Sequence, residues 1–580
     1  MFRNSNPTSA TNAMSTDLLN GPLVSEGRTL IDDLLGEQQL LTSVATFSRQ
    51  HERHTVPVQE KYYRDLIPLT SPAPGEQYAF AVDLDACTGC KACVTACHNL
   101  NGLDDDETWR DVGVLFGGTV LEPVQQTITT ACHHCVDPAC MNGCPVNAYD
   151  KNPVTGIVRH LDDQCIGCQY CTWKCPYDVP KYSKKRGIVR KCDMCSSRLA
   201  VGEAPACVQA CPNEAISITL VNKQQIANER KKGDGFLPGS PNPDYTLPTT
   251  QYRTSKTLPA NMAPGDLYEV KAEHAHQPLV LMLVLTQLSV GAFCTATILR
   301  LFFPSGLMRE LTPFHSLVAL LLGFLALGAS TMHLGRPLEA WRSFVGLGTS
   351  WLSREIMIFG LFAMLALIYA GSFWLPALSG LVPIPFEREL SSWPVQNAFG
   401  IGVAVTGLAG VFSSMMIYRD TRRTFWRMKF TSLKFTGTTV LLGPATILFT
   451  MTLQSLFVPG IVTLPAFRQV IVLLCGFLAA AMTAKLLWEF SVFTHLKDRE
   501  WTDMKRTALL MSGVLKRATV LRFVCGALGG VLLPLLVLFR VLPPVFATGI
   551  LPLSLLSELL ERYLFFTAVI PPKMPGGIAS

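Results

Sequence analysis

The sequence Cys165-Ile166-Gly167-Cys168-Gln169-Tyr170-Cys171-Thr172-Trp173-Lys174-Cys175-Pro176 contains four closely spaced cysteines. Their spacing, Cys-x2-Cys-x2-Cys-x3-Cys-Pro, is the run with which bacterial ferredoxins bind [4Fe–4S] clusters. The first three thiolates face one cubane, and the fourth ligates the other cluster of a pair. Zinc instead needs four ligands in one closed tetrahedron, commonly from two separated Cys-x2-Cys pairs. The spacing therefore favours iron–sulfur clusters over zinc.

Three further groups of cysteines repeat this pattern on either side of that stretch. Together the four groups use sixteen of the 19 cysteines, and every cysteine from Cys87 to Cys211 belongs to one of them. So dense a set favours iron–sulfur clusters over disulfides or a series of zinc ribbons. The other three groups are Cys87, Cys90, Cys93 and Cys97; Cys132, Cys135, Cys140 and Cys144; and Cys192, Cys195, Cys207 and Cys211.

The cysteine region also contains an internal repeat. Val82–Cys90 matches His160–Cys168, and each copy places a short β-like run before a cysteine loop. A further β-like run, Ile216–Leu220, follows the last group. This pattern predicts a duplicated ferredoxin-like domain of class α+β, dominated by loops, over residues 76–221.

Two segments without metal motifs flank this domain. Residues 1–75 form an N-terminal extension, in which Arg28–Arg49 has the spacing of an amphipathic helix that packs on the domain or on a partner. Residues 1–30 show neither an apolar export segment nor twin arginines before one, so we expect no export signal. Residues 222–276 are rich in Pro, Lys and Asn, which indicates a linker.

The second half of the chain is apolar, and hydrophobic residues make up 49% of the whole sequence. Residues 277–571 contain eight apolar segments of about 20 residues, the length that crosses a bilayer as a helix. We therefore predict an all-α transmembrane bundle of about eight helices. Arg540–Pro544 separates the seventh from the eighth. The segments are 278–303, 314–333, 355–378, 398–418, 435–457, 467–490, 518–539 and 545–569.

The charges of the chain point away from nucleic acid, because a net charge of +6 is small for 580 residues. A basic stretch lies between the third and fourth cysteine groups and includes Lys181, Lys184, Lys185, Arg190 and Lys191. It either balances the negative charge of thiolate-bound clusters or docks a partner subunit.

With these motifs in view, the chain resembles the dimethyl sulfoxide reductase family of molybdenum enzymes. Its four-group pattern, including Cys132–Cys140, is similar to the family's iron–sulfur subunit. Three motifs of the second half, His333–Pro337, Ser350–Ile356 and Glu558–Phe566, are similar to its membrane anchor. The resemblance covers residues 76–220 and 277–570, and it implies a fusion of two subunits that are separate chains in most relatives.

The resemblance also implies how the cysteines combine, which their spacing leaves open. In the family, groups one and four share two clusters, and groups two and three share the other two, with the fourth cluster nearest the membrane. Some relatives replace the residue at Cys168 and hold a three-iron cluster, whereas this chain keeps the cysteine. The implied sets for four [4Fe–4S] clusters are Cys87, Cys90, Cys93 and Cys211; Cys97, Cys192, Cys195 and Cys207; Cys132, Cys135, Cys140 and Cys175; and Cys144, Cys165, Cys168 and Cys171.

A catalytic partner is implied by the resemblance alone. The chain has no long molybdopterin-binding domain, so we expect a separate catalytic subunit with a bis-pterin guanine dinucleotide cofactor. This chain is then a redox subunit of an oxidoreductase complex, of the kind that serves anaerobic respiration, and its own chemistry is limited to quinone. Sulfoxide, N-oxide, polysulfide, sulfite and nitrate chemistries all use such a module, in either direction of electron flow.

Two ionisable residues at the ends of spans point to a quinone site. His333 ends the second segment and Glu355 begins the third on the same side, and the resemblance points to the same pair. A quinol, including menaquinol, sheds two protons as it gives up two electrons, and such groups accept protons. Alternatively, both residues cap helix ends in water. Arg336 and Arg354 would anchor lipid headgroups or pair with Glu355.

A b-type haem is not expected, because it needs histidines paired across helices at similar depth. The histidines in or beside the membrane half are His274, His276, His315, His333 and His495.

The leading prediction is an electron-transfer and anchor subunit that connects membrane quinone with a molybdenum subunit. A redox-driven ion pump or transporter is the alternative from another class, and it would favour charged residues within the spans. A purely structural anchor would not explain the cysteine groups. The charged residues within spans are few: Lys485, Glu489, Glu558, Glu561 and Arg562.

The charges of the loops predict the orientation of the chain in the inner membrane. Loops 334–354, 419–434 and 491–517 share a side with the cysteine domain and carry fifteen Lys and Arg residues, against five on the opposite side. Because Lys and Arg are retained in the cytoplasm, the clusters should face the cytoplasm. This orientation favours relatives that work inside the cell, such as sulfite dehydrogenases that pass electrons into quinone.

Overall fold

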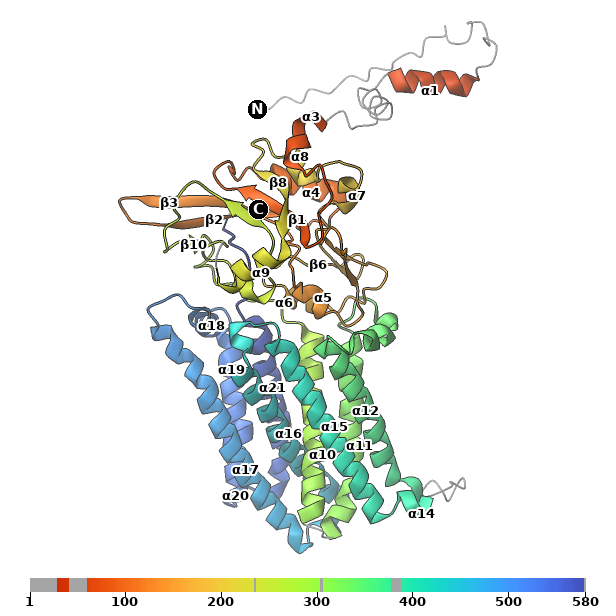
Figure 1. Ribbon diagram of the computed structural model, residues 1–580. Helices are drawn as coiled ribbons and strands as arrows, with labels where there is room; N and C mark the ends of the chain where they lie inside the picture. Colours follow the sequence, from red (N-terminus) through yellow and green to blue (C-terminus); the bar gives the residue numbers. More distant parts are fainter. Residues whose placement is uncertain (1–28, 41–59, 234–235, 303–305, 377–386, 578–580) are drawn as a thin grey trace, which may run out of the picture.

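The computed structural model describes residues 29–40, 60–233, 236–302, 306–376 and 387–577. Within these ranges, a domain of short strands and helices sits on one end of a bundle of long helices (Figure 1).

The strands of the domain form four small sheets. In the first, β1 lies between β8 and β9; it runs antiparallel to β8, with Val82 opposite Ile216, and parallel to β9. The second sheet has the order β10-β2-β3, and β4–β5 and β6–β7 are two-stranded. Both β1 and β5 run into cysteine loops, so the duplicated α+β fold is confirmed. The bounds are β1 Glu76–Asp83, β2 Asp111–Gly118, β3 Pro123–Thr130, β4 Tyr149–Lys151, β5 Val158–His160, β6 Lys181–Ser183, β7 Ile188–Arg190, β8 Ile216–Asn222, β9 Gln251–Arg253 and β10 Ala263–Pro264.

Short helices follow the cysteine loops, and most have a single turn. Two helices also precede the domain. The helix expected over Arg28–Arg49 is confirmed in α1 from Leu30 to Leu40, where Leu30, Ile31 and Leu35 are exposed, while 41–49 lies outside the described residues. The bounds are α1 Leu30–Leu40, α3 Glu60–Tyr63, α4 Ala92–Asn101, α5 Ala139–Asn142, α6 Tyr170–Lys174, α7 Ser196–Leu199, α8 Ala206–Gln209 and α9 Lys223–Lys231.

Two segments outside the cysteine region complete the domain. The segment 222–276 contributes β9 to the first sheet and β10 to the second. The C-terminal residues return from the bundle to the same domain, where Val114 N donates to Gly576 O (3.0 Å) and Met574 is buried in the domain core. The last described residues therefore lie against the cysteine domain (Figure 1).

The described residues include eight helices that are long and apolar enough to cross a membrane. The predicted bundle is therefore confirmed. The second span starts at Gly306 rather than 314, because the helix accommodates Pro313, and the seventh is interrupted by a π turn at Ala527–Leu532. The bounds are α10 Gln277–Phe302, α11 Gly306–Thr331, α12 Trp351–Ser372, α15 Trp393–Arg419, α16 Met428–Phe457, α17 Pro465–Phe490, α19 Lys516–Gly526, α20 Leu533–Leu538 and α21 Ile550–Thr567, with the shorter α14 Glu387–Leu390 and α18 Asp503–Ser512 between them.

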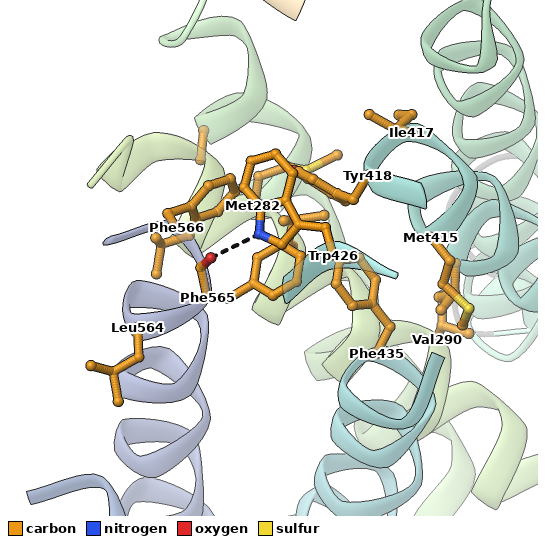
Figure 2. Close-up of a cluster of buried hydrophobic side chains, with 14 of the residues drawn as sticks. Met282, Val290, Met415, Ile417, Tyr418, Trp426, Phe435, Leu564, Phe565 and Phe566 are labelled. Carbon is orange, nitrogen blue, oxygen red and sulfur yellow. Dashed lines mark hydrogen bonds between the residues drawn. The ribbon is translucent and has the colours of Figure 1, made fainter. Parts of the chain in front are cut away.

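An aromatic cluster joins the domain to the bundle. The ring of Trp173, on α6, lies 5.6 Å from that of Trp426 and 5.8 Å from that of Phe566, measured between centroids. Figure 2 shows Trp426 beside Phe565, and its indole Nε1 donates to the backbone oxygen of Phe565 (2.9 Å). Packed aromatic rings of this kind hold the Cys165–Cys175 loop against the end of the bundle.

Candidate functional site

Left-handed backbone turns shape the cysteine loops. Gly89 (φ 76°) and Lys91 (φ 61°) flank Cys90, and Gly167 (φ 71°) and Gln169 (φ 59°) flank Cys168, so both copies of the repeat turn alike. Such turns favour glycine. At Gly167 space also requires glycine, because a Cβ atom there would lie 2.2 Å from the backbone oxygen of Gly187.

The folded chain brings the sixteen cysteines together in four groups drawn from distant parts of the sequence. Two groups line separate cavities. In the other two, the thiols are close enough to interact electrostatically with one another, and Cys192 also interacts with Cys132 of a neighbouring group. Each group has the same members as one of the ligand sets that the resemblance implies. Numbered by their place in the folded chain, and no longer by their order in the sequence, the groups are Cys87, Cys90, Cys93 and Cys211 (first group, lining one cavity); Cys132, Cys135, Cys140 and Cys175 (second group, lining the other); Cys97, Cys192, Cys195 and Cys207 (third group); and Cys144, Cys165, Cys168 and Cys171 (fourth group).

Backbone amides point at several of these sulfurs, as they do around iron–sulfur clusters. Ala148 N donates to Cys144 Sγ (3.2 Å), and Ala215 N donates to Cys211 Sγ (3.3 Å). Within the described residues, no three His, Cys, Asp or Glu side chains lie close enough to hold a single metal ion. In two of the groups the four cysteines line one cavity, which is the arrangement that a cubane needs.

Buried cations next to the cysteines fit the same interpretation. Lys191 is 3% exposed, and its Nζ lies 3.6 Å from Cys132 Sγ and 2.7 Å from the backbone oxygen of Cys192. Arg110 is 2% exposed, and its Nη2 has no hydrogen-bond partner in the described part of the chain. The thiolates of Cys207 and Cys93 would interact with it electrostatically. A buried cation is costly unless it is paired, and thiolate-bound clusters supply the missing negative charge.

The basic stretch lies partly among the buried cysteines and partly at the surface of the domain. Lys191 lies among the cysteines, whereas Lys184 and Lys185 pair at the surface with Asp106 (3.5 Å) and Asp104 (3.3 Å). Lys191 therefore fits the balance of cluster charge, whereas the buried Arg190 pairs with Glu107 (3.1 Å).

The first two anchor motifs dock on the loops of the fourth cysteine group. Arg336 N donates to the backbone oxygen of Ile166 (3.0 Å), and the Arg336 guanidinium donates to that of Asp162 (2.8 Å). Ser350 Oγ donates to the backbone oxygen of Gly143 (2.7 Å). Gly335 lies so close to Gly187 that a Cβ atom on it would be 2.0 Å from the Gly187 oxygen.

A cavity of about 180 Å³ lies between the cysteine loops at this junction and the ends of the membrane helices. His333 and Glu355 both line it, together with Cys168, Trp173 and Tyr418. The rest of its wall is mostly apolar and comes from α10, α11, α12 and α15. The cavity therefore connects the two residues predicted for quinone chemistry with a cysteine of the fourth group.

His333 and Glu355 are held in different ways. The Nε2 of His333 lies 3.1 Å from the backbone oxygen of Cys168, so Nε2 carries the hydrogen and donates. Burial lowers the pKa of His333, which favours the neutral ring with an accepting Nδ1. Glu355 is buried, and Ser414 Oγ donates to its carboxylate. The alternative in which Glu355 caps a helix end in water is therefore wrong.

The neighbouring arginines and histidines have other partners. Arg354 donates to the backbone oxygens of Leu347 (3.0 Å) and Gly348 (2.8 Å), and Arg336 to that of Asp162, so the expected pairing of either with Glu355 is wrong. His315 is buried in α11, with Nδ1 2.9 Å from Thr450 Oγ1 and Nε2 3.2 Å from the backbone oxygen of Ala292. His276 lies beside His333, and burial lowers its pKa to about 3.

The five charged residues that the sequence predicts within the spans belong to one buried network near the cluster-side ends of α16, α17, α19 and α21. The five predicted residues are joined by Lys434 and Arg522, which the sequence pattern does not single out for this role. Lys434 Nζ lies 2.6 Å from Glu561 Oε1, and Arg522 lies 3.0 Å from Glu489 and 3.1 Å from Glu558. The sequence predicts Lys434 in a loop, but it lies within α16 and is buried.

Comparisons with known proteins agree with this architecture. The family "DMSO reductase anchor subunit (DmsC)" matches residues 271–566, and a "4Fe-4S dicluster domain" matches residues 124–220. The chain belongs to the dimethyl sulfoxide reductase anchor family. It joins that membrane anchor and an iron–sulfur electron-transfer domain in one polypeptide, and it is a multi-pass membrane protein.

The chain is also similar over part of its length to several bacterial proteins, among them an iron–sulfur subunit. The B subunit of the anaerobic dimethyl sulfoxide reductase of Haemophilus influenzae is 38% identical over 190 residues, which are 31% of this chain and 91% of that protein. The hydrogenase-2 operon protein HybA of Escherichia coli O157:H7 is 34% identical, over 32% of this chain and 63% of its own length. The formate dehydrogenase-O iron–sulfur subunit of Escherichia coli K12 is 33% identical, over 28% and 61%.

Proposed function

We propose that this chain passes electrons between a quinone in the 180 Å³ cavity and a separate molybdenum catalytic subunit, through four [4Fe–4S] clusters. The observation that carries the proposal is the cavity itself, because His333, Glu355 and Cys168 line the same space. A quinone bound there would touch both proton-accepting side chains and the loop of the fourth cysteine group.

The cysteine groups support four clusters. Each group supplies four thiols, and Lys191 and Arg110 provide buried positive charge beside them. The clusters, once bound, supply a chain of one-electron carriers. The residues of this polypeptide fix their order, with the Cys144, Cys165, Cys168 and Cys171 group at the membrane junction.

The side chains around the cavity suit the protons of the reaction. Oxidation of a quinol releases two electrons and two protons. Neutral His333 has Nδ1 free to accept one proton, since its Nε2 donates to Cys168. The Glu355 carboxylate, held by Ser414, is the second acceptor. Reduction of a quinone would use the same groups in the opposite direction.

The partner and the orientation rest on the resemblance and on charge. A bis-pterin molybdenum subunit would bind the domain on the side away from the membrane, near the first cysteine group, where Cys90 is exposed. The excess of Lys and Arg on the cluster side favours a domain that faces the cytoplasm. The resemblance favours a dimethyl sulfoxide reductase-like complex, and a cytoplasmic domain would favour the sulfite dehydrogenase-like alternative.

The test is quinol-driven reduction of the purified protein in nanodiscs. Glu355→Gln and His333→Ala should each slow reduction of the clusters by a quinol by about 100-fold or more, the usual contribution of a positioned acid or base. Dithionite should still reduce the clusters. Met364→Ala, an exposed position on the same helix as Glu355, is the matched control and should behave like the wild type. Normal quinol-driven rates in both site variants would refute the proposed site.

A redox-driven ion pump is the second candidate, and the buried network favours it. Seven charged side chains from α16, α17, α19 and α21 lie inside the bundle, where charges are expensive and commonly functional. If the network moves protons, vesicles that contain the full complex should show a larger transmembrane pH change during turnover than the protons of the quinone itself account for. Glu558→Gln should then abolish this excess while electron transfer continues. Electron transfer without any transmembrane pH change beyond that of the quinone itself would leave the network a structural role.

A further inference from the structure

The α15–α16 connection contributes to a cavity of about 480 Å³ at the junction of domain and membrane. Three arginines from this connection, Arg419, Arg422 and Arg427, line it, and all three are exposed. From them we infer a binding site for the phosphate group of an anionic phospholipid.

The cavity has an excess of positive charge. The acid that lines it is Asp244, whose Oδ1 lies 3.3 Å from the Arg422 guanidinium. The neighbouring Asp420 is taken by Lys174, with Nζ 2.6 Å from Oδ2. Three cations therefore face one carboxylate, and an anionic ligand would restore the balance.

The backbone of the connection presents these charges. Arg422 has φ 56°, a conformation that costs a non-glycine residue free energy and that is often found at binding sites. Its guanidinium lies 4.3 Å above the ring of Tyr245, whose hydroxyl donates to the backbone oxygen of Asp420 (2.7 Å). The Arg422 side chain is thus held against the wall of the cavity.

Arg427 adds a second source of positive potential. It is the N-cap residue of α16, a helix of 30 residues, and its side chain makes no capping hydrogen bond. Met428 and Lys429 lie in the first turn of this helix, so no carbonyl of the helix accepts from their backbone N–H groups. An oxyanion in the cavity would accept from these amides and face the positive end of the helix dipole.

The position of the cavity identifies the ligand as a lipid. Arg419 ends α15 and Met428 begins α16 at the cluster-side end of the bundle, which is the level of the headgroups. Below Arg419, the same face of α15 carries exposed apolar side chains at helical spacing, namely Ile401, Val405, Leu408 and Phe412. Acyl chains would lie along this stripe while the phosphate occupies the cavity, an arrangement common in basic pockets at a membrane surface.

The experiment uses the whole protein, purified in detergent and stripped of lipid, with bound lipid counted by native mass spectrometry. Phosphatidylglycerol should bind roughly tenfold or more tightly than phosphatidylcholine, since each surface cation contributes to anionic-lipid binding. The triple variant Arg419→Gln, Arg422→Gln, Arg427→Gln should lose this preference. The single variant Arg427→Gln should weaken the preference for phosphatidylglycerol, and it replaces the triple variant if that variant is unstable.

The matched control removes the same charge elsewhere on the same side. Lys497→Gln, Arg499→Gln, Arg517→Gln changes three exposed cations and should keep the preference. An equal preference for phosphatidylglycerol in the wild type, the triple variant and the single Arg427→Gln variant would overturn the site. So would displacement of the lipid by millimolar inorganic phosphate, because the cavity would then bind free phosphate rather than a lipid.

Discussion

The Nε2 of His333 lies 3.1 Å from the backbone oxygen of Cys168. One residue belongs to the membrane anchor and the other to a cysteine loop, and both line the same cavity. This contact joins the proton chemistry expected of a quinone site to the cysteine group nearest the membrane. It also ties the position of His333 to the correct docking of the domain.

The metal content follows from the four cysteine groups. Anaerobically purified protein should contain about sixteen iron ions and as many acid-labile sulfides, four for each cubane, and negligible zinc. Cys475→Ser changes a buried cysteine of the bundle and should leave the iron content unchanged. A content near eight iron ions together with four zinc ions would contradict the assignment.

Docking of the domain depends on the close approach of Gly335 to Gly187. A Cβ atom on Gly335 would lie 2.0 Å from the Gly187 oxygen, so Gly335→Ala must push the two backbones apart at a cost of about 1–3 kcal/mol. We expect full iron content but slow reduction of the clusters by quinol. Gly348→Ala is the control, because a Cβ atom there meets nothing within 4 Å. Wild-type kinetics in Gly335→Ala would show that the contact is dispensable.

The buried network should contribute strongly to the stability of the bundle. Glu561→Gln leaves Lys434 without its partner at 2.6 Å, and loss of one member of a buried pair costs about 3–5 kcal/mol. The midpoint of thermal unfolding in detergent should fall by several degrees. Glu339→Gln, at the surface, should change it little. An unchanged midpoint in Glu561→Gln would mean that water compensates the unpaired Lys434.

The orientation can be tested with thiol reagents. Asp85→Cys, at an exposed position of the domain, should react with a membrane-impermeant maleimide only after the inner membrane is opened. The prediction follows from the excess of Lys and Arg on the cluster side. Reaction in spheroplasts with an intact inner membrane would place the domain outside.

The sequence predicts those features that follow from a short pattern. Cluster ligands need fixed spacings, so the groups around Cys87, Cys132, Cys165 and Cys192 are visible directly. A bilayer sets a minimum length for a helix, so the eight spans are found with errors only at their ends, such as the early start of α11 at Gly306.

Contacts between distant segments cannot be predicted in this way. Gly335 against Gly187, and Met574 in the domain core, depend on how separate elements meet in space, which no periodicity records. Lys434 lies near the end of a predicted span, so its position alone predicts a loop residue. It is buried because Glu561, on another helix, pairs with its charge. Ser414 and Tyr418 lie in an apolar segment without a charged signal, and they join the site only through helix packing.

The central claim is that electrons cross between quinone and clusters at the fourth cysteine group, and removal of that cluster tests it most directly. Cys171→Ala should retain about twelve iron ions, whereas Cys90→Ala, in the exposed first group, should lose a distant cluster instead. Quinol should then fail to reduce the remaining clusters of Cys171→Ala, although dithionite still does, and should reduce those of Cys90→Ala at the wild-type rate. Normal reduction of Cys171→Ala by quinol would contradict the account.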